Sequence, residues 1–201
     1  MNKIFLFDAD GVLVTPESYG ANYAMKKAGL DPSVLVELFH GQFKECSAGK
    51  MDLKDILAPL LVKWGYPHTI EEFLNDWFTH EHVYHQALLE YIQTLREDGY
   101  LCYLATDQEK YRAQFMIDTM QICSYVDGAY FSYAIGVTKS DTEFYKFVHH
   151  DLEKKLGKID VGSIFFTDDD EKNIAVAREY GMHGVVYKNT SQILAEIENF
   201  L

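Results

Sequence analysis

The chain has 201 residues, of which 48% are hydrophobic and 24% are charged, and its net charge is −13. This length suits one α/β domain that carries an insertion, and the acidic charge without any Lys/Arg cluster argues against a nucleic-acid partner. No stretch approaches the length of a membrane span and the N-terminus lacks the pattern of a signal peptide, so we expect a cytoplasmic protein with no membrane partner.

Short apolar runs predict five strands, at Lys3–Phe7, Tyr100–Ala105, Gly128–Tyr133, Ser163–Thr167 and Gly184–Tyr187. Several of them are apolar nearly throughout, which is typical of parallel strands covered on both faces. Segments with apolar residues at helical spacing alternate with these strands, at Ala87–Asp98, Gln108–Met120, Thr142–Leu156, Lys172–Tyr180 and Ser191–Phe200. Ser140 and Glu143 have the spacing of a capping box before the third helix. The alternation predicts an α/β fold with a Rossmann-like, doubly wound parallel sheet.

Residues 16–86 break this rhythm, because they carry helical patterns and no convincing strand. The candidate helices are Ala21–Ala28, Pro32–Phe39, Leu53–Trp64 and Ile70–Phe78, separated by glycines and a proline. We therefore expect two parts: a core formed by residues 1–15 and 87–201, and a small all-helical module, residues 16–86, inserted after the first strand.

Polar side chains follow the predicted strands at the points where the strands end. The first strand is followed by Asp8, Asp10 and Gly11, and the second by Thr106. Lys139 lies in the loop after the third strand. The fourth strand is followed by Asp168 and Asp169. Ligands of open parallel sheets bind beyond the carboxyl ends of the strands, so these groups should converge. Paired carboxylates form a site for a hard cation, and an acidic protein that handles phosphate needs such a local positive charge. A nucleophile, a metal and donors for phosphate oxygens are the requirements of phosphoryl transfer.

This set of residues resembles the four motifs of the haloacid dehalogenase (HAD) superfamily, in its phosphatase-type members. The segment FLFDADGVL at residues 5–13 closely matches the first motif, and FFTDDDEKN at 165–173 is similar to the DDxxxN form of the fourth. The helical module at residues 16–86 looks like the cap that many members carry after the first motif. The resemblance covers the whole chain and implies a hydrolase of phosphoric monoester bonds that acts on a small phosphorylated metabolite.

The resemblance also implies a role for each residue. Asp8 would be the nucleophile, forming an aspartyl-phosphate, and Asp10 the general acid and then the base for the attacking water. Asp8, the backbone carbonyl of Asp10, and Asp169 would hold Mg²⁺, with Asp168 and Asn173 in support. Thr106 and Lys139 would bind the phosphate. The carboxylate at Asp10 favours phosphatase over dehalogenase chemistry, because a halide leaving group needs no proton.

Two positions depart from the family pattern. Asp107 stands where Asn is common, and Ser140 follows Lys139 where Pro is common, which leaves Lys146 as a fallback for the phosphate-binding lysine. Asp107 directly precedes a predicted helix, so we expect its carboxylate to cap the amides of Glu109 or Lys110 and to point away from the phosphate.

Other readings of the sequence remain open. A phosphomutase or another HAD phosphotransferase would use the same nucleophile, and a signalling receiver domain or a non-catalytic phosphate-binding protein would use a similar set of side chains. The receiver lacks a large insertion after the first strand. His80, His82 and His85 have a spacing that could suit zinc, although a polar hinge between the two parts explains them more simply.

Overall fold

The structure, a computed structural model, describes residues 3–201. In this part of the chain five parallel strands form one sheet in the order β3-β2-β1-β4-β5. Their bounds are Ile4–Phe7 (β1), Leu101–Thr106 (β2), Gly128–Phe131 (β3), Ile164–Asp168 (β4) and His183–Val186 (β5). β1 lies at the centre, where Phe5 pairs with Cys102 of β2 and with Phe165 of β4. The α/β, doubly wound fold class predicted from the sequence is confirmed.

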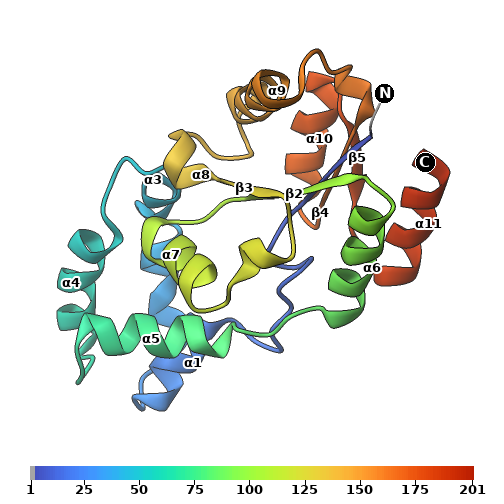
Figure 1. Cartoon of the computed structure of the whole chain (residues 1–201). Coiled ribbons are helices and arrows are strands. Elements are labelled where there is room, and N and C mark those ends of the chain that lie inside the picture. Colours follow the sequence, from blue (N-terminus) through green and yellow to red (C-terminus); the bar gives the residue numbers. More distant parts are fainter. Residues whose placement is uncertain (1–2) are drawn as a thin grey trace.

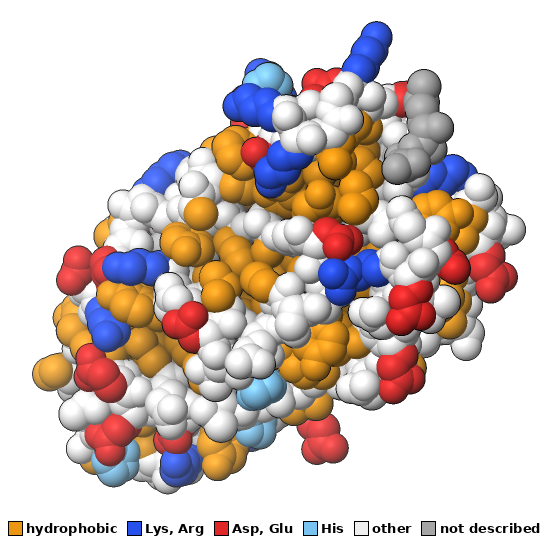
Figure 2. All heavy atoms as spheres, viewed as in Figure 1, with side chains coloured by type: hydrophobic (Ala, Val, Ile, Leu, Met, Phe, Trp, Pro, Cys, Tyr) orange, Lys and Arg blue, Asp and Glu red, His pale blue; other side chains and the backbone are white. Residues whose placement is uncertain are grey.

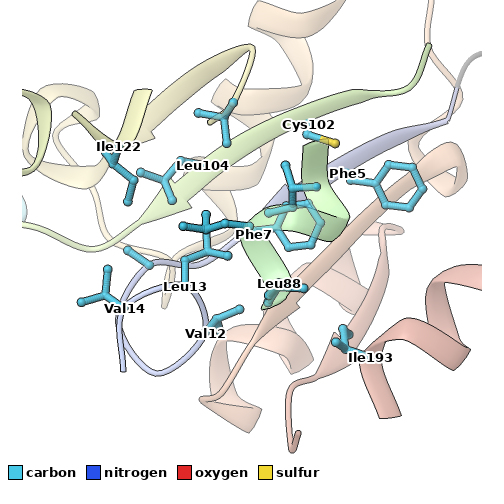
Figure 3. Close-up of a cluster of buried hydrophobic side chains, with 14 of the residues drawn as sticks. Phe5, Phe7, Val12, Leu13, Val14, Leu88, Cys102, Leu104, Ile122 and Ile193 are labelled. Atoms are coloured by element: carbon cyan, nitrogen blue, oxygen red, sulfur yellow. The ribbon is translucent and has the colours of Figure 1, made fainter. Parts of the chain in front are cut away.

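Helices cover both faces of the sheet (Figure 1). On one face lie α6 (Gln86–Glu97), α7 (Lys110–Asp118) and α11 (Thr190–Phe200), whose apolar residues pack on Phe5, Phe7 and Leu104. Figure 3 shows Leu88 of α6 and Ile193 of α11 beside these strand residues. On the other face α9 (Thr142–Leu156) and α10 (Glu171–Tyr180) pack on Ile4, Leu6 and Phe166. Each fully buried Leu, Ile or Phe stabilises the fold by about 1.5–3 kcal/mol, so these two helical layers hold the sheet in place.

The segment between β1 and α6 builds a hydrophobic cluster of its own. It contains α1 (Gly20–Lys27), a 3₁₀ turn (Pro32–Leu35), α2 (Val36–Phe39), α3 (Phe43–Ser47), α4 (Leu53–Trp64) and α5 (Ile70–His80), and we call it the α1–α5 segment. Met25, Leu57, Phe73 and Trp77 are among its buried members. Figure 1 shows α1, α4 and α5 grouped beside the sheet.

The two stretches that join the α1–α5 segment to the sheet lie side by side. Thr15 N–H donates to Val83 O at 2.9 Å, and His85 N–H donates to Leu13 O at 2.9 Å. Further contacts tie the segment to the other elements: Tyr111 O–H of α7 donates to the Asp52 carboxylate at 2.8 Å, and the hydroxyl of Ser132, in the short helix α8 (Ser132–Ile135), donates to Ser47 O at 2.6 Å. The segment is thus anchored at both ends and along its side.

Charged side chains contribute less to this architecture than the apolar clusters. On the face shown in Figure 2, acidic and basic side chains are interspersed around patches of hydrophobic atoms. Surface pairs such as Lys155–Asp151, at 2.7 Å, are screened by water and ions and add little stability. Among residues 3–201, no helix has both the length and the apolar character needed to cross a membrane.

Several local predictions are wrong in detail. The helix expected at Gln108–Met120 spans only Lys110–Asp118, because the Glu109 side chain accepts hydrogen bonds from the amides of Tyr111 and Arg112 and is the N-cap. Asp107 is therefore not the cap.

The capping box at Ser140 is also absent from the described residues, since Asp141 caps α9 and Ser140 pairs with Thr138. The five-residue helix α3 is too short to show a helical period, and the sequence did not predict it.

The buried cap of α7 makes the stability of the protein depend on pH. Glu109 is 2% exposed, and burial raises its pKa from 4.5 to about 7 despite the amide hydrogen bonds it accepts. A raised carboxyl pKa gives stability that is fully present below about pH 4.5 and is lost as the pH rises through 7. The shift corresponds to roughly 3 kcal/mol at most.

We therefore expect Glu109→Gln to lose less stability than the wild type between pH 5 and pH 8. Chemical denaturation of both proteins at the two pH values measures the difference, in which titrations common to both cancel. Glu97→Gln, at an exposed helix position, is the matched control and should show no such gap. Parallel stability curves for wild type and Glu109→Gln would mean that Glu109 is not protonated near neutral pH.

Candidate active site

Asp8 lies at the centre of the carboxyl edge of the sheet. It directly follows β1, and its N–H donates to Thr167 O of β4 at 3.0 Å, so the sheet still fixes its backbone. The residue is 5% exposed. Its Oδ1 accepts a hydrogen bond from Ala9 N–H at 2.7 Å. The carboxylate is thus held at one position by the strand and by its own loop.

Lys139 lies between two buried carboxylates. Its Nζ is 2.7 Å from Asp8 Oδ1 and 2.7 Å from Asp168 Oδ2, and the residue is 2% exposed. Burial alone would lower the pKa of Lys139, but the carboxylates of Asp8, Asp168 and Asp107 outweigh it and raise the pKa, so the ammonium stays charged. Burial also raises the pKa of Asp8, and Lys139 opposes this shift only in part. One ammonium thus faces several carboxylates, and a further cation would balance the remaining negative charge.

Three carboxylates lie close enough to share such a cation. Oxygens of Asp8, Asp168 and Asp169 lie within 4.8 Å of one another, and the residues described contain no other group of three His, Cys, Asp or Glu side chains that meets this spacing. Carboxylate oxygens suit Mg²⁺, so the donor set fits the expected ion. Asp168 belongs to this group by its side chain, whereas the sequence had assigned it a supporting role. The backbone carbonyl of Asp10 as a ligand stays a prediction.

Glycine at position 11 makes room for the carboxylate of Asp169. Gly11 has φ +79°, and a Cβ there would overlap the carboxylate of Asp169. On its other side Asp168 accepts hydrogen bonds from Asp170 N–H at 2.7 Å and from Asn173 Nδ2 at 3.1 Å. The supporting role of Asn173 stays a prediction, and this contact is the one through which it would act.

The carboxylate of Asp10 is not part of the group of three acids and has its own partners on and near α7. Its Oδ2 accepts a hydrogen bond from Gln108 Nε2 at 2.7 Å, and its Oδ1 lies 3.6 Å from Nη2 of Arg112. Gln108 also donates to the Thr106 hydroxyl at 3.1 Å. The sequence analysis missed Gln108 and Arg112. The one signal available was the position of Gln108, two residues after a strand that ends at the site.

Asp107 has a role other than the one expected. Its Oδ1 accepts a hydrogen bond from the backbone N–H of Lys139 at 2.9 Å, which ties the loop carrying that lysine to the end of β2. Burial raises the pKa of the Asp107 carboxyl, and the nearby Lys139 charge opposes the shift. The expectation that it caps Glu109 or Lys110 was wrong because Glu109 itself satisfies the first amides of α7.

A cavity of about 770 Å³ opens over these residues. The lining includes every predicted site residue: Asp8, Asp10, Thr106, Lys139, Asp168, Asp169 and Asn173. A second cavity of about 500 Å³ adjoins it at Asp10 and Glu81 and lies between the α1–α5 segment and α7, with Phe39, Trp77 and Arg112 in its wall. The candidate site residues thus face a space of two adjoining cavities that is large enough for a small molecule.

The fallback lysine and the three candidate histidines lie outside the lining of the first cavity. Lys146 pairs with Glu143 on the exposed surface of α9, at 3.0 Å. His80 lies 2.9 Å from the hydroxyl of Ser18 and stacks on Tyr23, and His85 caps α6 by accepting from Leu88 N–H. Within the described residues, none of the three candidate histidines belongs to a group with metal-binding spacing.

Comparison with known proteins supports the family resemblance. No protein-family model matches the chain. It is 27% identical over 190 residues to a D-ribitol-5-phosphate phosphatase of Bacteroides thetaiotaomicron, covering 90% of this chain and 89% of the relative. Among solved structures it resembles a HAD family enzyme of the same organism in complex with magnesium and inorganic phosphate, at a TM-score of 0.79 and 23% identity over 96% of this chain and 99% of the other.

It also resembles a predicted HAD-like family hydrolase of Porphyromonas gingivalis, with a TM-score of 0.76 and 18% identity over 99% of this chain and 97% of the other. These structures establish the fold, and the sequence relative spans nearly the same length. The motif residues of the sequence also meet at one edge of that fold, so the resemblance to the haloacid dehalogenase superfamily extends from the motifs to the structure.

Proposed function

We propose that this protein is a Mg²⁺-dependent phosphatase that hydrolyses small phosphomonoesters through an aspartyl-phosphate on Asp8. One observation carries the proposal: a buried, strand-held carboxylate lies 2.7 Å from a buried ammonium and within 4.8 Å of two further carboxylates, at the floor of a cavity. A nucleophile, a cation for phosphate oxygens and a metal site are the parts that phosphoryl transfer requires.

Asp8, Asp168 and Asp169 would hold the ion. Bound Mg²⁺ would neutralise charge on the phosphate and so reduce its repulsion from the acidic floor of the site. Lys139 would contribute a second positive charge, and its hydrogen bonds to Asp8 and Asp168 keep the ammonium beside the nucleophile. The Thr106 hydroxyl lies at the end of the adjacent strand β2 and could donate to another phosphate oxygen.

The reaction would proceed in two steps. In the first, an oxygen of Asp8 forms a bond to phosphorus, the ester P–O bond breaks, and Asp10 gives a proton to the leaving alkoxide. In the second, Asp10 takes a proton from a water molecule whose oxygen bonds to phosphorus, and the bond to Asp8 breaks to release phosphate. Gln108 holds the Asp10 carboxylate in the lining of the same cavity as Asp8, where it would serve both steps.

The α1–α5 segment would act as the cap that closes over the substrate. It provides one wall of the second cavity, whereas the residues that would react come from the sheet. The relative that acts on D-ribitol 5-phosphate, according to its name, suggests polyol and sugar phosphates as the first substrates to test. Neutral hydroxyl groups suit a cavity whose wall combines aromatic rings with carboxylate and amide groups.

The first prediction concerns the nucleophile and the ion. Phosphate release from polyol and sugar phosphates should stop in excess chelator, return with Mg²⁺, and fall at least about 100-fold in Asp8→Asn, or ~2.7 kcal/mol of barrier. Asp160→Asn, at a turn outside the cavity, is the matched control and should keep full activity. Full turnover by Asp8→Asn would exclude the covalent route, and an isomer in place of free phosphate would indicate a mutase.

A second prediction tests the metal site through Gly11. Gly11→Ala should raise the Mg²⁺ concentration needed for half-maximal activity, because the new methyl group displaces Asp169. Gly65→Ala is the control: it has φ +70° and open space around it, so it suffers the same backbone strain of about 1 kcal/mol without touching the site. Equal Mg²⁺ requirements in the two variants would show that Asp169 does not bind the ion.

A third prediction concerns Asp107, which lines the cavity and holds the Lys139 loop. Asp107→Asn keeps a side-chain oxygen for the Lys139 amide, so kcat/KM should change by less than about tenfold, or ~1.4 kcal/mol. Asp107→Ala removes the acceptor and should lose more. If Asp107→Asn instead raised kcat/KM a hundredfold, the negative charge would have to oppose the phosphate directly.

A further inference from the structure

Arg112 is an almost fully buried cation that the proposed chemistry does not use. The residue, on α7, is 3% exposed. Its Nη1 donates to Phe78 O at 3.4 Å and contacts the Met120 sulfur at 3.6 Å, and its guanidinium lies over the rings of Phe78 and Phe115. Burying an arginine is costly unless anions compensate it, so its position beside the site calls for a physical reason.

Two carboxylates compensate the charge, and they belong to different parts of the molecule. Nη2 lies 3.6 Å from Asp10 Oδ1 and 3.4 Å from Glu81 Oε2. Both distances are long, and Nε and Nη2 have no hydrogen-bond partner among the described residues. The guanidinium is therefore shared between the two acids and is not committed to either by a close hydrogen bond.

Glu81, the second carboxylate near Arg112, is itself held in place by the α1–α5 segment. It is 8% exposed and lies just after α5, where the chain leaves the α1–α5 segment. Its Oε1 accepts hydrogen bonds from Gly20 N–H, at the start of α1, at 2.8 Å and from Trp77 Nε1 at 2.9 Å. Glu81 thus holds the beginning and the end of the segment together while its second oxygen faces Arg112.

Asp10 is the most exposed member of the group. Its side chain is 51% exposed, whereas those of Arg112 and Glu81 are 4% and 11% exposed. A half-exposed carboxylate samples several rotamers unless donors restrict it. Gln108 restrains one oxygen by a hydrogen bond at 2.7 Å, and the charge of Arg112 attracts the other.

We propose that Arg112 is a positioning residue that holds the Asp10 carboxylate in the orientation needed for proton transfer. The inference rests on the proposed function, in which Asp10 protonates the leaving group. Arg112 does not touch the substrate in this role. It acts through Asp10, and Glu81 keeps the guanidinium in place.

Two substrates whose leaving groups differ in their need for a proton can distinguish this positioning role from a merely structural one. An alkoxide needs a proton from Asp10 in order to leave, whereas 4-nitrophenolate is stable enough to leave without one. Loss of Asp10 orientation should therefore lower kcat/KM for an alkyl phosphate far more than for 4-nitrophenyl phosphate. General damage to the fold or to the metal site would lower both values alike.

The experiment compares kcat/KM for 4-nitrophenyl phosphate and for the best alkyl phosphate among the polyol and sugar phosphates tested, with Mg²⁺ present. Arg112→Gln should lose at least tenfold more on the alkyl substrate than on the aryl substrate, as should Asp10→Asn. In the double variant, Arg112→Gln should add nothing to the alkyl loss of Asp10→Asn, because both changes remove the same interaction. Arg112→Lys, which keeps the charge, should recover part of the alkyl activity.

Arg96→Gln is the matched control, since this partly buried arginine pairs with Asp127 at 3.0 Å outside both cavities. Equal losses on the two substrates, or additive losses in the double variant, would overturn the inference, as would a wild type that hydrolyses only the aryl ester. If Arg112→Gln does not fold, Arg112→Lys and Arg112→Met carry the same comparison. A wild type that releases phosphate from neither substrate would instead mean that the proposed function has failed.

Discussion

The ammonium of Lys139, between Asp8 and Asp168, is the interaction on which the site depends. Two carboxylates buried at the ends of neighbouring strands repel each other and lose hydration, which costs several kcal/mol per ion without a compensating charge. Lys139 supplies that charge at 2.7 Å from each. The order of the strands then fixes the rest, because β1 and β4 pair in register and bring Asp8 and Asp168 to the same edge. The loop that delivers the lysine is in turn held by Asp107.

The sequence predicted the parts of the molecule that local patterns encode. The strands carry continuous apolar runs, and the rule that ligands bind beyond their carboxyl ends placed Asp8, Thr106, Lys139 and Asp168 together. All four line the same cavity. The sheet could be predicted for the same reason: each strand must be apolar on both faces, and this requirement leaves a mark within a few residues.

The sequence did not predict contacts between distant segments. Gln108 and Asp10 are 98 positions apart, and nothing near either residue shows that they meet. The sequence analysis did not single out Arg112 or Glu81, because only tertiary packing buries them. The prediction of the α7 cap failed for a different reason. Asp107 and Glu109 both precede the helix, and both side chains can accept hydrogen bonds from its first amides. Which of them turns toward the amides depends on the competing donor that Lys139 offers to Asp107.

The adjacent stretches on either side of the α1–α5 segment have a consequence for how the chain can vary and fold. A hydrogen bond joins Thr15 to Val83, so the chain leaves β1 and returns toward α6 at neighbouring points, as it would in a short turn. Loop-closure entropy grows only by about 0.6 kcal/mol for each doubling of length, so an insertion here hardly penalises the pairing of β1 with β2. The length of the α1–α5 segment is therefore a weak constraint on the register of the sheet, and with it on the spacing of the acidic groups.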